Sequence, residues 1–558
     1  MKFSELKYER PDFKKYQEEL NNIAEKIANA TSADEVFDAY DEYSNIEAEY
    51  GENITISCIR AYQDSTDEYF NNEYVYNGAE EARLDRNVVF NALLASTFRK
   101  DIDEKYGSQL LRIIEKNASL TKSAAEERCK LAELEVKYQN LKATIKFEYD
   151  GKILSEGEMR KLKKSEDRKV RKEACHIYYK TFADKRDEFM PLLKEMVKLR
   201  NKIARANGYD TYSEYMNVEK GRYSYGEKEL INLCELVKEK LVPVAKEIHE
   251  NIKDELGLDS YKLCDSGIYS KEGVLTTSGN AKEILGQGRE MYKDLSDEMY
   301  ELYNSMIEGE YIDCEASPNK IAGMGFTTDL LKSKKLFIFG NFNGTASFDI
   351  IVPTHEFGHA YQMNKTMESV KAYDYIRMPN DLVEIPSKTM EQLSYEYADL
   401  FVKGKGEQYV REHKIGVLEE ILVFCMTNEF ETFLYNNEDA TEDEIINKYM
   451  ELDKIYNEGL DISDERESLE QGAAMYANMG VNLLPKYVIS YVLSDITALT
   501  IKKIFDANKE EGLHLYNKIC ELGGTMEYVD AMKYLGLELA YTEKAIDVAR
   551  ESFMELLN

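Results

Sequence analysis

Two histidines and the glutamate that follows the first of them are the part of this sequence that points most directly to chemistry. His355 and His359 are four residues apart, so a helix would place both imidazoles on one face, where they could bind one metal ion. Glu356 would lie about 100° round the helix from His355, close enough to act on a metal-bound water without binding the metal itself. This H-E-x-x-H spacing predicts a hydrolase that holds one zinc ion per chain.

The alternative is an exposed amphipathic helix that carries two solvated histidines. Gly358 argues against it, because a glycine inside a helix costs about 1 kcal/mol relative to alanine and usually marks close approach by another segment. Pro353 suits the first turn of a helix, although the sequence is also consistent with a longer helix that is kinked at the proline. The motif therefore favours a helix that packs against a neighbour.

Catalytic zinc needs an open position for water and a third protein ligand. Zinc lowers the pKa of its bound water to about 7, and we expect Glu356 to take the water's proton and later give it to the leaving amine. No histidine follows in the G-x-x-H arrangement of metzincins, so a carboxylate from a second helix is expected. The candidates are Glu368, Asp374, Asp381, Glu384 and Glu391.

Glu384 stands out among these carboxylates. Pro386 and Ser387 are expected to open a helix there, and Glu391 returns to the same face seven residues later. Glu384 would bind the metal, while Asp381 and Glu391 could accept N–H hydrogen bonds from the ligand imidazoles and fix their tautomers. The alternative is that Asp381 and Glu384 are a helix cap and its capping-box partner, and spacing alone leaves both open.

Helical periodicity covers most of the chain that must position these residues. Ser32 with Glu35 predicts a capping box for a helix that Gly51 would end. Segments rich in Glu, Lys, Leu and Ala continue the pattern over about 80–255 and 387–558. Before them, four apolar residues fall on one face of a first helix: Tyr16, Leu20, Ile23 and Ile27.

One region departs from the helical pattern. From about 256 to 350 the chain accumulates Gly, Ser, Thr and Asn, with β-prone runs at 323–328 and 335–339. This predicts a small sheet or hairpin just before the metal motif. An edge strand there could pair with an extended peptide, and the alternative is a purely structural hairpin.

Composition and charge exclude several classes of protein. The 558 residues are 43% hydrophobic, and the formal net charge of −33 disfavours nucleic acid and anionic membranes as partners. The first residues carry no apolar segment of signal-peptide length, and no run of about 18 apolar residues occurs. The eight cysteines include no C-x-x-C pair. We therefore expect a soluble cytoplasmic protein without disulfides, whose oligomeric state the sequence does not indicate.

The segments 354–360 and 381–391 resemble the thimet oligopeptidase and oligoendopeptidase F family of zinc peptidases, and 339–345 resembles the strand and turn that precede its motif. In that family the third ligand is a glutamate 25 residues after the second histidine, within an E-x-P-S motif. Glu384 matches both the spacing and the neighbours, so the resemblance assigns it as the ligand.

The resemblance also implies a fold and a substrate class. It implies a large, mainly α-helical peptidase of two lobes that face each other across a deep substrate channel, with the small sheet next to the motif helix. We expect an N-terminal helical region at 1–110 and a catalytic region at 111–558, packed as one continuous unit. Substrates would be short unstructured peptides that are cut internally.

Family members also use tyrosines, and often a histidine, to stabilise the oxyanion. The matching stretch is 483–491, where Tyr491 aligns best with the family's catalytic tyrosine and Tyr487 lies one turn away. This chain departs from the pattern, because no histidine occurs between 414 and 513 and the loop 477–482 lacks the usual histidine and one tyrosine. The absence of this histidine and tyrosine is consistent with a slower enzyme or with an unusual substrate range.

Three functions compete on these observations. The leading one is a zinc endopeptidase for oligopeptides. A gluzincin-type exopeptidase would need an anchor for a peptide terminus, and no motif for one is found. A peptide-binding protein that has lost turnover is the third, and the retention of Glu356 argues against it. The other four histidines are expected to be ordinary surface residues: His176, His249, His413 and His514.

Overall fold

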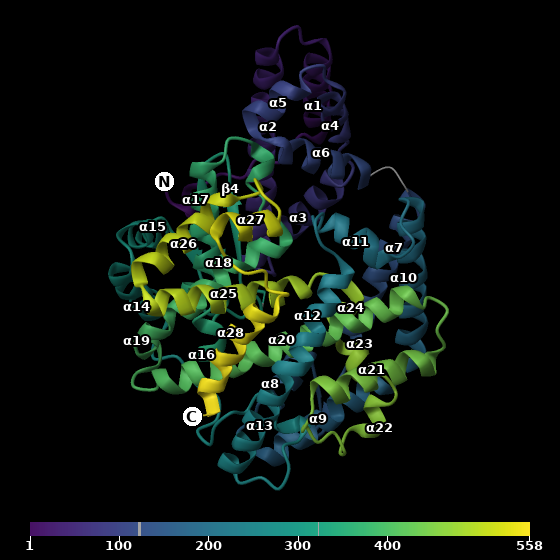
Figure 1. The fold of residues 1–558 in the computed structure, drawn as a ribbon, viewed down its shortest axis with the longest axis vertical. Coiled ribbons are helices and arrows are strands. Elements are labelled where there is room, and N and C mark those ends of the chain that lie inside the picture. The colour runs from purple at the N-terminus through teal and green to yellow at the C-terminus, as the bar shows by residue number, and fades with distance from the viewer. Residues whose placement is uncertain (121–123, 322, 558) are drawn as a thin grey trace. The chain divides into compact units, whose positions relative to one another are not determined.

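The computed structural model describes residues 1–120, 124–321 and 323–557 of a mainly helical chain (Figure 1). The chain divides into two compact units, and each is assembled from three segments. Unit 1 consists of Met1–Lys122, Thr276–Gly406 and Ile504–Ala531. Unit 2 consists of Ser123–Leu275, Glu407–Lys503 and Met532–Asn558. The mainly α fold is confirmed, whereas the proposed division after residue 110 stays a prediction.

Unit 1 contains the small sheet, the metal motif and the N-terminal helices. Its elements in chain order are α1 (Phe13–Asn29), α2 (Ala33–Gln63), α3 (Glu68–Glu81), α4 (Asn87–Ala95), α5 (Arg99–Tyr106), α6 (Ser108–Leu120), α14 (Ala281–Leu295), α15 (Asp297–Glu308), β3 (Ile312–Asp313), β4 (Phe326–Leu330), β5 (Lys335–Phe339), α16 (Ala346–Asp349), α17 (Phe357–Ser369), α18 (Asn380–Leu393), α19 (Ala398–Val402) and α26 (Lys509–Leu522). Helix α27 (Tyr528–Leu535) continues from unit 1 into unit 2 along the chain.

The N-terminal helices of unit 1 share an apolar core. All four residues predicted on one face of the first helix, α1, are buried in it. Ser32 caps α2 by accepting a hydrogen bond from Glu35 N, as expected. The predicted end at Gly51 is wrong, because α2 runs on to Gln63. Burial of Ile56 and Ile59 beyond the glycine stabilises the helix, and this outweighs the roughly 1 kcal/mol that glycine costs.

The predicted sheet next to the motif helix is present. Its strand order is β3-β5-β4, with β3 parallel and β4 antiparallel to β5. In the β4–β5 register, Thr327 lies opposite Ile338. Four of the five β5 residues are buried, so β5 is the core strand, and β4 is an edge strand of the sheet. Helix α17, which carries His359, packs against both β4 and β5.

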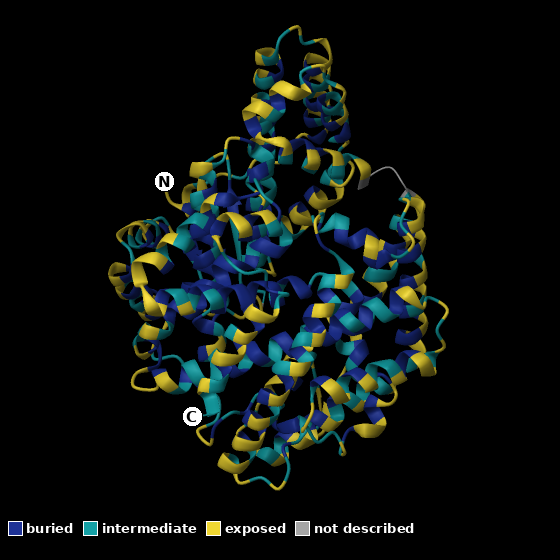
Figure 2. Cartoon of the chain, in the orientation of Figure 1, coloured by how far each residue is buried: buried dark blue, intermediate teal, exposed yellow. Residues whose placement is uncertain are grey.

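In the described part of unit 2 the only strands are β1 and β2, which pair antiparallel as a hairpin, and the other elements are helices. Figure 2 shows buried and exposed residues alternating along the outer helices of both units, whereas other helices, such as α18 (Asn380–Leu393), are buried nearly all round. The elements are α7 (Ala125–Thr144), β1 (Phe147–Tyr149), β2 (Lys152–Leu154), α8 (Glu156–Leu162), α9 (Arg168–Ala183), α10 (Arg186–Ala206), α11 (Tyr212–Glu219), α12 (Glu227–Lys240), α13 (Val242–Leu256), α20 (Gly406–Asn436), α21 (Glu442–Tyr456), α22 (Arg466–Leu469), α23 (Ala473–Ala477), α24 (Met479–Leu483), α25 (Ile489–Ala507) and α28 (Glu543–Met554).

One histidine of unit 2 corrects an expectation. His249 was expected on the surface, but it is buried, with Nε2 2.9 Å from Glu419 Oε1 and its ring against Tyr261. The apolar neighbours of His249 on α13 are buried and bury the histidine with them. The Glu419 carboxylate forms a hydrogen bond with one of its ring nitrogens. Among the described residues, no helix combines the length and the apolar character needed to cross a bilayer.

Candidate metal centre

The motif lies at the start of a helix that begins with a π-helical turn, Val352–Glu356. In this turn, Glu356 N donates a hydrogen bond to the carbonyl oxygen of Ile351 over 2.9 Å, and α17 follows directly. Pro353 is the second residue of the turn, where its missing N–H leaves no hydrogen bond unmade. Single π turns occur frequently at functional sites.

Three side chains of unit 1 converge with the geometry of a metal site. The ligand atoms of His355, His359 and Glu384 all lie within 4.8 Å of one another. Nε2 of His355 is 3.5 Å, and Nε2 of His359 is 3.2 Å, from the same carboxylate oxygen, Oε2 of Glu384. The two imidazole rings are nearly perpendicular, at 83°. Glu384 is thus the carboxylate that faces both histidines.

These distances fit a tetrahedral zinc ion. Zinc binds imidazole nitrogen and carboxylate oxygen at about 2.0–2.2 Å, so two ligands at the tetrahedral angle stand roughly 3.3 Å apart. The two nitrogen–oxygen separations, 3.5 and 3.2 Å, lie on either side of that value. Two imidazoles and one carboxylate also leave a fourth position for water, which is the ligand set of catalytic zinc.

The second carboxylate of α18 supports one of the histidines. Oε1 of Glu391 lies 2.5 Å from Nδ1 of His355, so Nδ1–H donates to it and Nε2 is the nitrogen left to bind a metal. Asp381, the other expected acceptor, is buried in the first turn of α18. Nδ1 of His359 is buried and has no hydrogen-bond partner in the described structure.

The close packing of α17 on α18 explains Gly358. A Cβ atom at this position would lie 2.8 Å from Cα of Ser387 and 3.0 Å from the carbonyl oxygen of Pro386. Only a glycine lets the two backbones approach this closely, and the approach brings Glu384 up to the histidines. Pro386 corrects an expectation, because α18 begins at Asn380 and the proline lies inside the helix rather than at its start.

The neighbours of Glu384 set its charge. Burial tends to raise the pKa of this carboxyl, but the imidazoles of His359 and His355 and the Ser387 hydroxyl together hold it well below its usual value. The Ser387 hydroxyl lies 2.9 Å from Oε2 of Glu384. Burial lowers the pKa of His355, yet the hydrogen bond and charge of Glu391 raise it to about 9. A metal ion would displace the proton that this imidazole holds.

Glu356 contacts a strand that the sequence did not connect with it. Oγ1 of Thr327, on β4, lies 2.7 Å from Oε2 of Glu356. A Cβ atom at Gly325 would lie 3.2 Å from Oε1 of the same carboxylate. The β-prone run 323–328 predicts a strand. The alternating pattern of a strand does not show which side chain of another element a threonine hydroxyl contacts.

Both candidate tyrosines are part of unit 2. Tyr491 lies in the first turn of α25, and Tyr487 lies two residues before that helix. Their rings meet edge to face, with centroids 5.6 Å apart and an interplanar angle of 80°. Tyr491 also contacts Phe424 of α20, at 5.7 Å between ring centroids. Their assignment as oxyanion donors stays a prediction that rests on the resemblance.

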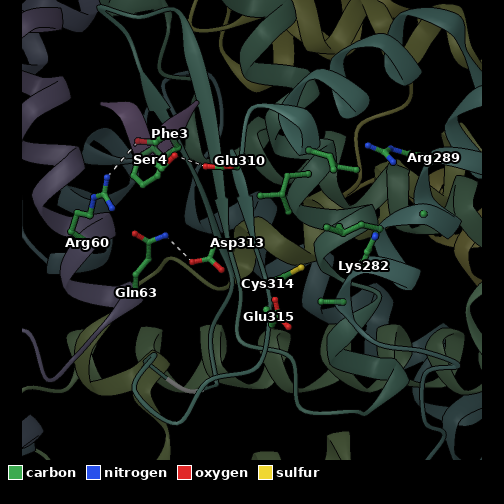
Figure 3. Close-up of a pocket in the computed structure, with 15 residues that line it drawn as sticks. Phe3, Ser4, Arg60, Gln63, Lys282, Arg289, Glu310, Asp313, Cys314 and Glu315 are labelled. Carbon is green, nitrogen blue, oxygen red and sulfur yellow. Dashed lines mark hydrogen bonds between the residues drawn. The ribbon is translucent and has the colours of Figure 1, made fainter. Parts of the chain in front are cut away.

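A separate pocket of about 450 Å³ in unit 1 lies between residues 3–4, α2, α14 and β3 (Figure 3). Two of its carboxylates already have partners. Glu310 accepts from the Ser4 hydroxyl at 2.5 Å and Asp313 accepts from the Gln63 amide at 2.7 Å. His355, His359 and Glu384 do not line this pocket, so it is not part of the metal centre.

A mainly helical protein in which an H-E-x-x-H helix packs against a helix that brings a glutamate to both histidines has the site of a metallopeptidase. Comparison with known families narrows this class. Residues 161–549 match the model of peptidase family M3, and residues 3–121 match the peptidase M3 N-terminal domain. The chain belongs to peptidase family M3, which confirms the resemblance.

Individual relatives agree with this family. The chain is 23% identical over 418 residues to oligopeptidase PepF of Bacillus subtilis, a match that covers 73% of this chain and 59% of that protein. It is also 23% identical over 397 residues to an oligoendopeptidase F homolog of Borreliella burgdorferi, covering 68% of this chain and 63% of the relative. Both matches span less than two thirds of the relative's length.

Solved structures resemble the chain over nearly its whole length. PZ peptidase A, solved with an inhibitor, is 26% identical and has a TM-score of 0.89, with 99% of each chain covered. Oligoendopeptidase F from Enterococcus faecium is 18% identical with a TM-score of 0.66, covering 98% of this chain and 96% of that one. The similarity to the Enterococcus faecium structure supports the fold alone.

Proposed function

We propose that this protein is a zinc-dependent endopeptidase that hydrolyses internal bonds of short unstructured peptides. The observation that carries the proposal is the placement of His355, His359 and Glu384 at the separations of tetrahedral zinc, with Glu356 next to His355. Membership of peptidase family M3, and relatives named as oligopeptidases, support the substrate class.

His355, His359 and Glu384 would hold the zinc ion. When bound, zinc supplies a Lewis acid that polarises the scissile carbonyl and lowers the pKa of a water. Glu356 accepts a proton from the attacking water and then donates it to the nitrogen of the leaving amine. Glu391 keeps His355 in the tautomer that presents Nε2.

The edge strand beside the site supports a peptide substrate. Strand β4 forms one edge of the three-stranded sheet, and its Thr327 contacts Glu356. An extended peptide can add to such an edge through main-chain hydrogen bonds, which place the backbone without selecting side chains. In this position the scissile bond would be held next to the general base, as proximity catalysis requires.

Cleavage of an internally quenched peptide of about ten residues tests the proposal, with the cut position read by mass spectrometry. Internal cuts that stop on chelation and return with zinc are the expected result. Glu356→Gln should lower kcat by about 10²–10⁴-fold, whereas Glu368→Gln, an exposed glutamate on α17, should not. Loss of terminal residues only would indicate an exopeptidase. Tight binding of one zinc without turnover of a peptide panel would indicate a peptide-binding protein.

A further inference from the structure

The carboxylate of Glu356 rests against the edge strand β4 rather than standing free beside the metal ligands. Oγ1 of Thr327 lies 2.7 Å from Oε2 of the carboxylate and 2.8 Å from the carbonyl oxygen of the same residue. Glu356 is buried, with 5% of its surface exposed, so few other positions are open to its side chain. The strand thus holds the carboxylate from one side.

Gly325 leaves the room that this arrangement needs. A Cβ atom on Gly325 would lie 3.2 Å from Oε1 of Glu356, 3.6 Å from its Cγ and 3.4 Å from the carbonyl oxygen of Phe339. The first distance is tighter than an ordinary van der Waals contact, so a larger residue would require the carboxylate to shift by a few tenths of an ångström. Thr327 on β4 and Gly325, which directly precedes the strand, therefore both contact the same side chain.

The chemistry of a hydroxyl decides which acceptor Thr327 serves. A threonine hydroxyl has one proton to donate, and two oxygens of Glu356 are within reach. A hydrogen bond to an ionised carboxylate is roughly twice as strong as one to a neutral carbonyl, so the proton points to Oε2. The hydrogen bond lowers the basicity of Oε2 and holds it against β4, so Oε1 is the more basic oxygen to exchange a proton with water and the leaving group.

We propose that Thr327 is a positioning residue that fixes Oε2 of Glu356 on β4, so that Oε1 carries the proton during peptide hydrolysis. The proposal rests on the proposed function. As the water oxygen bonds to the scissile carbonyl carbon, one water proton moves to Oε1, and the same proton then moves from Oε1 to the amine nitrogen as the C–N bond breaks. Thr327 keeps its own proton throughout and donates to Oε2 in both states.

Substitution of the hydroxyl by a methyl group tests this role, because Thr327→Val keeps the shape and the β-branch. We expect kcat to fall by about 10–100-fold, since a base displaced by a fraction of an ångström loses proximity and orientation. KM should change less than about threefold, because pairing of a peptide with the edge of β4 would use main-chain groups. The zinc content should stay at one per chain, because the Thr327 hydroxyl bonds to Glu356 and not to the three proposed ligands. Thr327→Ser, which keeps the hydroxyl, should recover most of kcat.

Thr328→Val is the matched control, since it removes a hydroxyl from the next position of β4, whose side chain points to the opposite face. It should keep kcat within about twofold of the wild type. Gly325→Ala is an independent test that leaves Thr327 intact, and it should lower kcat in the same way as Thr327→Val.

Four outcomes would overturn the inference: an unchanged kcat in Thr327→Val, an equal loss in Thr327→Ser, an equal loss in Thr328→Val, or zinc loss that accounts for the fall in kcat. Failure of the proposed function is distinguishable, because the wild type itself would then cleave no peptide internally. If Thr327→Val does not fold, an unchanged kcat in Gly325→Ala would also overturn the inference.

Discussion

At the residue scale, the metal centre depends on which nitrogen of each imidazole is free. Glu391 accepts the Nδ1 proton of His355, which leaves Nε2 to face Glu384. Ser387 supports Glu384 in a similar way, with its hydroxyl 2.9 Å from Oε2. The E-x-P-S segment therefore supplies both a ligand and the hydroxyl that orients it. Two of the three proposed ligands, His355 and Glu384, are thus held by a second side chain, which is how metal sites keep their geometry.

The role of Tyr491 is a prediction at the same scale. Tyr491→Phe removes a phenol O–H that would donate to the developing oxyanion, so kcat should fall by about 10²–10³-fold with little change in KM. Steady-state kinetics on the quenched peptide measures both constants. Tyr487→Phe is the comparison, since its ring contacts that of Tyr491. A wild-type kcat in Tyr491→Phe would show that another group stabilises the oxyanion.

At the element scale, the distance between α17 and α18 sets the metal site. Gly358→Ala would place a Cβ atom 2.8 Å from a backbone carbon of α18, so the two helices must move apart. We expect this to lower the free energy of unfolding by about 1–3 kcal/mol and to weaken zinc binding. Urea unfolding and zinc titration measure the two effects.

Gly51→Ala is the control for that substitution. Gly51 lies inside α2, and no atom lies within 4 Å of a Cβ at this position. Alanine should therefore leave zinc binding unchanged and raise the stability by up to about 1 kcal/mol, because alanine favours a helix. Similar zinc affinities for Gly358→Ala and the wild type would contradict the link between helix spacing and the metal site.

The two glycines also show how far sequence could predict these elements. The prediction of close packing at Gly358 is confirmed, because a glycine inside a helix costs free energy and usually marks close approach by another segment. The prediction that Gly51 ends a helix is wrong, because burial of Ile56 and Ile59 stabilises the helix and local propensity does not include that burial. The prediction that Pro386 opens a helix is wrong for the same reason, because packing stabilises α18 with the proline inside it.

At the scale of the whole molecule, each unit joins segments that are distant in the sequence. Unit 1 brings the N-terminal helices together with Thr276–Gly406 and part of the C-terminal region. Periodicity predicted most of these helices. The spacing of His355 and His359, with the family resemblance for Glu384, predicted the three side chains that the fold brings together. It could not identify the contact of Thr327 with Glu356, because that contact depends on which strand packs against which helix.

Stability of the whole molecule should depend on pH through a carboxyl that joins two of these distant segments. Asp374 accepts a hydrogen bond from the Tyr40 hydroxyl of α2 at 2.6 Å. Burial is the main cause that raises the pKa of Asp374, to about 6. A raised pKa means that the fold favours the neutral carboxyl, so the stabilisation is complete below about pH 4 and is lost as the pH rises through 6.

Asp374→Asn should remove this dependence, because an amide stays neutral and can still accept a hydrogen bond from Tyr40. Between pH 4 and 7 the wild type should lose roughly 2–3 kcal/mol of unfolding free energy relative to the variant, from a shift of about two pKa units. Urea unfolding at several pH values measures the difference. Asp38→Asn removes the same charge from an exposed position of α2 and controls for the net charge of −33. If wild type and Asp374→Asn change in parallel with pH, the pKa of Asp374 is the same in the folded and the unfolded protein, and the prediction is wrong.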